Sequence, residues 1–117
     1  MDPAVLVGTG GAVGAALRYL VSAALPSDPF PVATLTVNVL GSFALAALVF
    51  AGTAGDLSLL FGVGLCGSFT TYSSFSVETV RLWETGSRLR AAIYAGGTFL
   101  ACALAAGAAW GLLAVLG

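Results

Sequence analysis

The sequence predicts an all-α integral membrane protein, a single domain over residues 1–117 with four transmembrane helices, the third of them broken near mid-membrane. Of the 117 residues, 59% are hydrophobic and 8% are charged, which is more apolar surface than a soluble domain of this size can bury. A membrane-spanning helix needs about 20 apolar residues, so the chain has room for roughly four spans. A run of hydroxyl side chains interrupts the apolar pattern in the third of these.

The first span is expected at residues 4–24. Gly8, Gly11 and Gly14 recur every three residues and so share one side of the helix, which is typical of close helix packing. Arg18 follows one turn later, where an unpaired guanidinium in hydrocarbon would cost about 3 kcal/mol or more. It is therefore either an interfacial anchor or a fixed positive charge that draws anions toward the membrane.

The second span is expected at residues 32–51, after a loop at 26–31 whose three prolines end the first helix. Asn38 lies near the middle of this span, with Thr34 and Ser42 one turn away on either side. A buried carboxamide can simply hold helices together. An NH₂ group flanked by hydroxyls also offers a row of hydrogen-bond donors to a dehydrated anion.

The third span is expected at residues 57–80, after a glycine-containing turn at 52–56. Its segment GSFTTYSSFS, residues 67–76, carries seven hydroxyl groups, Ser74 among them. Lipid cannot satisfy hydroxyls or freed backbone groups, so a polar break at this depth is found where protein or a hydrated route surrounds it. The segment is a candidate ion path, and an ordinary helix whose hydroxyls bond back to the preceding turn is the alternative.

The fourth span is expected at residues 91–116, after a charged loop at 81–90. Tyr94, Thr98 and Cys102 lie at positions i, i+4 and i+8, so they share one stripe of the helix. The stripe is either a further row of polar groups for an ion or a seam between helices, since glycines on the same helix also favour close packing.

The residue inventory argues against an enzyme. The chain has no histidine, which removes His-based catalytic triads and the commonest transition-metal ligand. Cys66 and Cys102 form no CxxC pair and are best explained as packing residues. All five acids, Glu78 among them, lie in or beside the predicted loops, so we expect no mid-membrane carboxylate for proton coupling. We also expect no nucleic-acid partner.

Three sequence blocks resemble the Fluc or CrcB family of small fluoride channels. They are GTGGAVGAALRY at 8–19, TLTVNVLGSF at 34–43 and GLCGSFTTYSSFSVE at 64–78, in the order and at the spacing of that family. The resemblance implies a multi-pass protein of the inner (plasma) membrane that exports fluoride passively from the cytoplasm and so relieves fluoride toxicity.

The resemblance also implies a dual-topology dimer: two antiparallel subunits in membrane lipid, with two fluoride pores and a structural sodium ion at the interface. Main-chain carbonyls at the break would hold the sodium ion, which carries over to Gly67 and Thr70. The family's pair of pore phenylalanines falls on Tyr72 and Phe75.

The remaining family positions carry over to the other polar residues discussed above. The expected ion pathway comprises Asn38, Tyr72, Phe75, Thr34, Ser74, Tyr94, Thr98 and Arg18. Asn38 looks like the pore asparagine, Arg18 looks like the vestibule arginine, and the fourth-helix track would run from Tyr94 through Thr98 to Cys102. Two positions depart from the family pattern: Tyr72 stands in place of a phenylalanine, and the thiol of Cys102 is a weaker donor than a hydroxyl.

Two other functions are compatible with four helices. A small multidrug-type or cation exporter would need a titratable carboxylate inside the membrane, and the first span offers only Arg18. A membrane assembly protein would use the polar residues only to hold helices together.

The charges do not settle how two subunits would pair. Arg81, Arg88 and Arg90 all lie in the third loop, whereas the N-terminus and the second loop carry no Lys or Arg. The positive-inside rule would place the third loop in the cytoplasm. An antiparallel homodimer needs the same chain to insert in both directions, so a heterodimer with an oppositely biased paralogue is the alternative.

Overall fold

The computed structural model describes residues 1–26 and 30–117, and these residues are almost entirely helical. In chain order the elements are α1 (Pro3–Ala24), α2 (Val32–Phe50), η1 (Ser58–Cys66), α3 (Gly67–Phe69), α4 (Tyr72–Glu84) and α5 (Arg88–Leu116). Within the described residues, three helices (α1, α2 and α5) are long and apolar enough to cross a membrane. The third predicted helix is divided into η1, α3 and α4, and η1 is a π-helix, a form that often occurs at functional sites.

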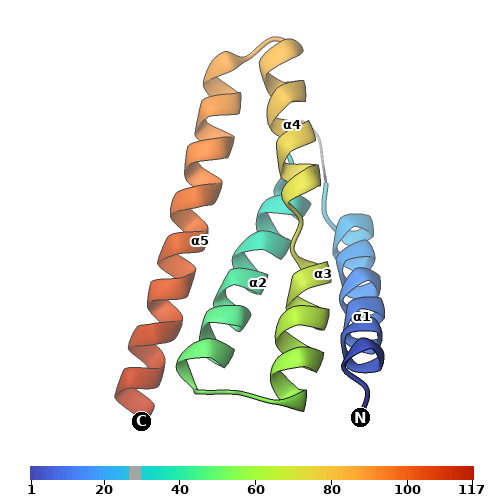
Figure 1. Ribbon diagram of the computed structural model, residues 1–117. Coiled ribbons are helices and arrows are strands. Elements are labelled where there is room, and N and C mark those ends of the chain that lie inside the picture. Colours follow the sequence, from blue (N-terminus) through green and yellow to red (C-terminus); the bar gives the residue numbers. More distant parts are fainter. Residues whose placement is uncertain (27–29) are drawn as a thin grey trace.

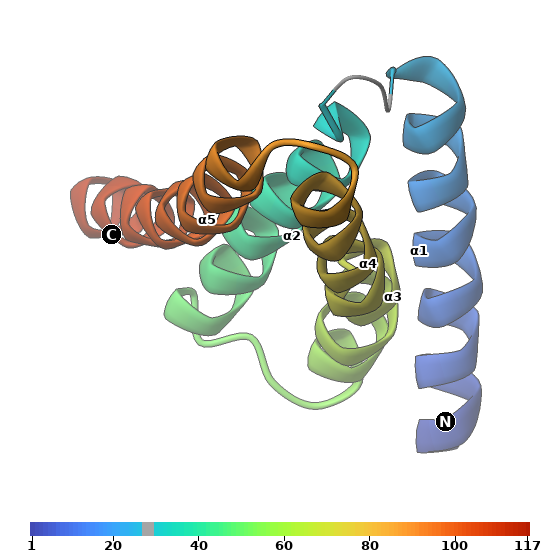
Figure 2. The ribbon, with the colours of Figure 1, turned by 90° about the horizontal axis from the view of Figure 1, so that it is seen from above.

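The helices lie side by side in the order α5, α2, the divided third helix and α1 (Figures 1 and 2). The molecule measures 48 × 33 × 20 Å, so it is long enough to match a bilayer with its headgroups, roughly 40–45 Å, but thin in one direction. Both termini lie at the same end (Figure 1), as an even number of crossings requires.

The charged segment 81–90 is mostly helix, so its interpretation as a loop was wrong. Helix α4 continues to Glu84 and α5 begins at Arg88, which leaves a turn of three residues. Gly86 makes the turn with a φ of +134°, and the hydroxyl oxygen of Ser87 accepts a hydrogen bond from the Arg90 N–H at 3.0 Å. This cap pairs the Arg90 N–H, one of the free N–H groups in the first turn of α5, and so helps the helix begin before the apolar span.

Glycines bring α1 against the lower half of the divided helix. A Cβ atom at Gly10 would meet the Leu60 carbonyl, and one at Gly14 would meet the Leu65 carbonyl and the Ser68 hydroxyl. Ser68 donates a hydrogen bond to the Gly11 carbonyl at 2.7 Å. Close packing of this helix is therefore confirmed, but the residues that require it are Gly10 and Gly14.

Other glycines expected at helix contacts meet no described neighbour. A Cβ atom would find nothing within 4 Å in the described part of the chain at Gly8, or at Gly96, Gly97, Gly107 and Gly111 of α5. Within the described part of one subunit these glycines therefore make no close helix contact, and their expected role in packing stays a prediction.

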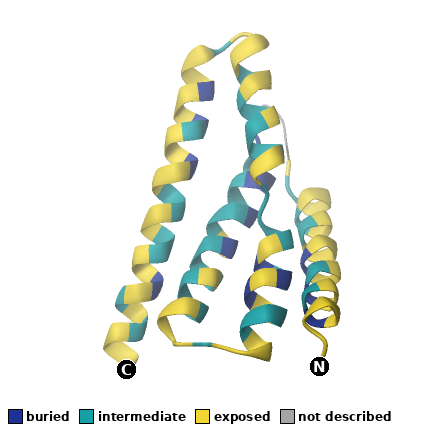
Figure 3. Cartoon of the chain, in the orientation of Figure 1, coloured by how far each residue is buried: buried dark blue, intermediate teal, exposed yellow. Residues whose placement is uncertain are grey.

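The buried residues form a narrow seam rather than a central core. Val37 of α2 and Tyr94 of α5 are each 1% exposed, and buried positions occupy only the sides of helices that face a neighbour (Figure 3). Large apolar side chains cover the outer faces, which is the pattern expected where lipid rather than water is the solvent.

Candidate functional site

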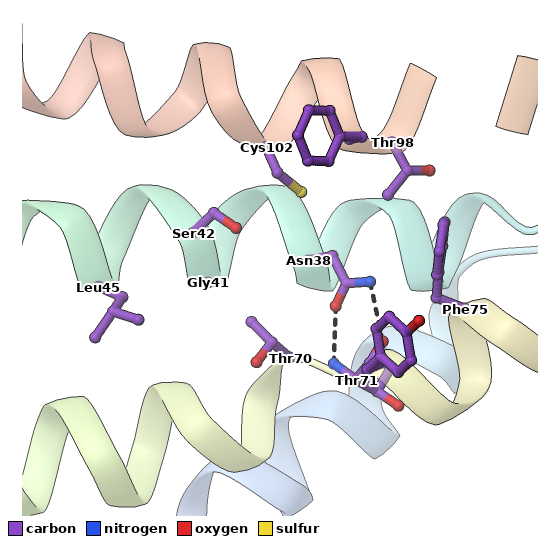
Figure 4. Close-up of a pocket in the computed structure, with 11 residues that line it drawn as sticks. Asn38, Gly41, Ser42, Leu45, Thr70, Thr71, Phe75, Thr98 and Cys102 are labelled. Atoms are coloured by element: carbon purple, nitrogen blue, oxygen red, sulfur yellow. Dashed lines mark hydrogen bonds between the residues drawn. The ribbon is translucent and has the colours of Figure 1, made fainter. Parts of the chain in front are cut away.

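The helix break lies at Thr70 and Thr71, and Asn38 holds it. Both threonines are extended, with ψ of 159° at Thr70 and φ of −148° at Thr71. The Thr71 N–H donates to Asn38 Oδ1 at 2.8 Å, and Asn38 Nδ2 donates to the Thr71 carbonyl at 3.1 Å (Figure 4). A single carboxamide of α2 thus satisfies both main-chain groups of the residue where the helix is interrupted, as a buried break requires.

The break deprives carbonyls on its N-terminal side of their regular helical partners, those of Gly67 and Thr70 among them. In a continuous helix the Gly67 carbonyl would accept from the Thr71 N–H, which here donates to Asn38. The Thr70 carbonyl would likewise accept from the Ser74 N–H, which donates instead to the Thr71 hydroxyl at 3.1 Å. Gly67 and Thr70 are the two residues expected to hold sodium.

A cavity of about 330 Å³ lies beside the break. It is lined by Asn38, Gly41, Ser42, Leu45, Thr70, Thr71, Tyr72, Phe75, Thr98, Phe99 and Cys102. The cavity therefore brings together residues of α2, of the break, of α4 and of α5 (Figure 4). Its lining mixes an amide, hydroxyls and a thiol with aromatic rings.

A row of aromatic rings extends from this cavity into the seam between α4 and α5. The ring centroids of Tyr72 and Phe75 are 6.1 Å apart, those of Phe75 and Tyr94 are 5.3 Å apart, and the Tyr94 ring meets the edge of Phe30 at 5.3 Å. Tyr72 is 82% exposed, so the row begins on an open face of the subunit and ends among buried residues.

Two hydroxyls on the α5 stripe are buried without a partner in the described part of the chain. Tyr94 is 1% exposed and Thr98 is 5% exposed, and neither side-chain oxygen has a hydrogen-bond partner among the residues that the structure describes. Buried hydroxyls normally have hydrogen-bond partners. A ligand or a water molecule bound beside these two hydroxyls would explain why neither has one.

Glu78 is a site residue that the sequence reasoning did not single out. It lies on α4, half-buried, and its Oε1 accepts a hydrogen bond from Thr34 Oγ1 of α2 at 2.5 Å. A carboxylate therefore does lie within the predicted third span. Its spacing of three from Phe75 is a signal that could have placed it on the same side of α4.

Not every predicted residue lines the cavity. Arg18 lies in a separate hollow of about 220 Å³ with Ala15, Tyr19 and Ser22, and its Nε is buried with no hydrogen-bond partner among residues 1–26 and 30–117. Thr34 and Tyr94 lie deeper in the seam, and Ser74 contributes its N–H to the cap of α4.

No group of three or more His, Cys, Asp or Glu residues that could hold a metal ion occurs among the described residues. The oxygens freed at the break are main-chain carbonyls, which suit a hard cation such as sodium rather than a transition metal.

Comparison with known proteins gives matches over nearly the whole chain. Residues 5–111 match the model of a family described as "CrcB-like protein, Camphor Resistance (CrcB)". "Fluoride-specific ion channel FluC 2" of Haloarcula marismortui is 56% identical over 117 residues, which cover 99% of this chain and 98% of the relative. "Fluoride-specific ion channel FluC 1" of Halobacterium salinarum is 53% identical over 96% of this chain and 94% of its own length. "Fluoride-specific ion channel FluC" of Alteromonas mediterranea is 50% identical over 74% of each chain.

Proposed function

This chain belongs to the CrcB family and is a fluoride channel rather than an enzyme, and we propose that fluoride passes through the cavity beside the α3–α4 break. The observation that carries this proposal is the junction of Asn38 with Thr71 next to the cavity. It places hydrogen-bond donors and a helix break at the same point of a membrane protein, as ion-conducting sites require.

The cavity lining suits a small, strongly hydrated anion. One N–H of the Asn38 side chain donates to the Thr71 carbonyl, so the second N–H can donate to an anion. The hydroxyl of Thr98 can also donate, and the ring edge of Phe75 carries positive charge. Together these groups can replace water around fluoride, and a larger halide would fit such a row poorly.

The buried hydroxyl of Tyr94 extends the path beyond the cavity. Its ring centroid lies 5.3 Å from that of Phe75, so the Tyr94 hydroxyl is the next polar group along the aromatic row. Thr34 and Glu78 lie on the neighbouring elements and are joined to each other. Arg18, in its separate hollow, would act from a distance by attracting anions to its end of the channel.

The relatives decide against the exporter alternative. A multidrug-type or cation exporter would need a titratable carboxylate inside the membrane, and the first span offers only Arg18. The carboxylate of Glu78 lies on α4 and accepts a hydrogen bond from Thr34. Curated proteins up to 56% identical over nearly the full length are named as fluoride-specific channels.

Purified protein in liposomes is expected to release fluoride down its gradient much faster than chloride, without any coupled ion or energy source. The physical reason is the row of neutral donors, which can replace the tightly held water of the small fluoride ion. An ion-selective electrode measures both rates, and empty liposomes give the background. Equal release of the two halides would contradict the proposed selectivity.

We further propose that two antiparallel copies assemble in the plasma membrane around a sodium ion. The subunit is only 20 Å thick in one direction, and Tyr72 beside the break is 82% exposed, so a second copy would cover a polar and aromatic face. The freed carbonyls of one chain include those of Gly67 and Thr70, and a second copy would bring the same groups, which together make a suitable set of oxygen ligands. Replacement of sodium by a much larger cation is the probe of this site.

An antiparallel homodimer predicts that any given turn of the chain is labelled equally from both faces of the membrane. In a background without native cysteines, Thr85→Cys marks the α4–α5 turn and Ala54→Cys marks the opposite turn, and both positions are exposed. A homodimer inserts in both directions, so an impermeant thiol reagent should label each variant from both sides.

One-sided labelling would contradict the homodimer. The arginines at 81, 88 and 90 would then have fixed the orientation, and the chain would need an oppositely oriented paralogue to conduct. Full fluoride release by this chain alone would exclude that second arrangement.

A further inference from the structure

We propose that Cys102 is a site of reversible thiol modification, at which a small disulfide-forming compound closes the fluoride path. The proposal rests on the proposed function, because it takes the cavity beside the break to be that path. Cys102 is half-buried on α5 and lines the cavity of about 330 Å³. Its sulfur points from α5 toward α2 (Figure 4).

A second observation indicates that the space beside this thiol holds a ligand. Thr98 lies one helical turn before Cys102 and lines the same cavity. It is 5% exposed, and its hydroxyl oxygen has no hydrogen-bond partner in the part of the chain that the structure describes. A buried hydroxyl of this kind is normally satisfied by water or a bound group. Cys102 itself is only half-buried on the wall of this cavity, so its side chain keeps the partial exposure that thiol chemistry requires.

The other cysteine provides an internal contrast. Cys66 is 3% exposed in η1 and is not among the residues that line the cavity. Its neighbour in the chain, Gly67, begins α3, and the Cys66 carbonyl accepts bonds from the N–H and the hydroxyl of Thr70. Buried cysteines in such packing are inert, so reagents should distinguish the two thiols.

The modification is an ordinary exchange at sulfur. The Cys102 thiol gives its proton to water, and the thiolate attacks one sulfur of a disulfide or a thiosulfonate. A new S–S bond forms to Cys102, the old sulfur–sulfur bond breaks, and the leaving group departs as a thiolate or a sulfinate. The attached group then occupies part of the cavity that Asn38 and Thr98 also line, where it displaces the anion, and an added thiol reverses the exchange.

Methyl methanethiosulfonate is the probe, because it is small and attaches only an S-methyl group. Reconstituted wild type, Cys66→Ser and Cys102→Ser are each compared with their own fluoride flux before the reagent, and intact mass counts the attached groups. Wild type and Cys66→Ser should gain one group per chain and lose most of their flux, and dithiothreitol should restore it. Cys102→Ser should keep its own flux and gain no group.

The possible failures separate the two proposals. A conducting channel that remains unlabelled, or that is labelled at Cys102 with its flux unchanged, overturns the thiol site alone. Equal block of Cys102→Ser also overturns it. A chain that is labelled but releases no fluoride before the reagent overturns the proposed path, and the block with it.

Discussion

Replacing Asn38 by leucine is expected to abolish fluoride release. The substitution keeps the approximate size of the side chain but removes both hydrogen bonds to Thr71. The N–H and the carbonyl of Thr71 would then be unpaired at the helix break, and each unsatisfied buried group costs about 1–3 kcal/mol. The break would rearrange to recover these bonds, and the cavity would lose its amide donor as well.

Thr36→Val is the matched control for this change. Thr36 lies on the same helix and its hydroxyl donates to the Val32 carbonyl at 2.8 Å, so valine also removes a side-chain hydrogen bond from α2, but away from the break. Gel filtration in detergent should show that both variants are folded and assembled. Fluoride release by Asn38→Leu at the rate of Thr36→Val would refute the role of Asn38.

Replacing Gly10 by alanine is expected to destabilise the subunit severely. A Cβ atom at this position would meet the Leu60 carbonyl and would lie 2.9 Å from the Leu65 nitrogen. Both are main-chain atoms of η1 and cannot move aside by a side-chain rotation. Overpacking of this kind costs about 1–3 kcal/mol and at times more, so α1 would have to separate from η1.

Gly8→Ala gives the comparison on the same helix. A Cβ atom there meets nothing within 4 Å among the described residues, and alanine in a helix is favoured over glycine by about 0.5–1 kcal/mol. Thermal unfolding in detergent should therefore show a clearly lower midpoint for Gly10→Ala and an unchanged or slightly higher midpoint for Gly8→Ala. Equal midpoints would show that the contact between α1 and η1 is not as close as described.

Composition and spacing were sufficient to predict the membrane class and the approximate positions of the long apolar helices α1, α2 and α5. Apolar runs of about 20 residues leave few alternatives to a spanning helix, and the loop prolines and glycines mark where the helices end. The run of hydroxyls from 67 to 76 also located the break to within ten residues. These properties depend on neighbours in the chain, so the sequence carries them directly.

Only the tertiary structure decided where the third helix breaks and which carboxylate enters the seam. The break lies at Thr70 and Thr71 because Asn38, on another helix, takes both main-chain groups of Thr71. By position alone Glu78 lies near the end of the predicted third span, and only the packing of α2 against α4 shows that Thr34 donates to it. Such bonds join residues 33 and 44 positions apart, and no local pattern encodes them.

The same distinction applies to the glycines and to the cavity. Gly8 and Gly10 are equivalent by residue type, and only the approach of η1 makes one of them indispensable. The cavity collects side chains from α2, the break, α4 and α5, so its lining depends on how four segments pack. The sequence determined which polar groups are present in the membrane. The packing of the helices decided which of these groups face one another, because a hydrogen bond between buried polar groups stabilises the protein only when the two helices that carry them are in contact.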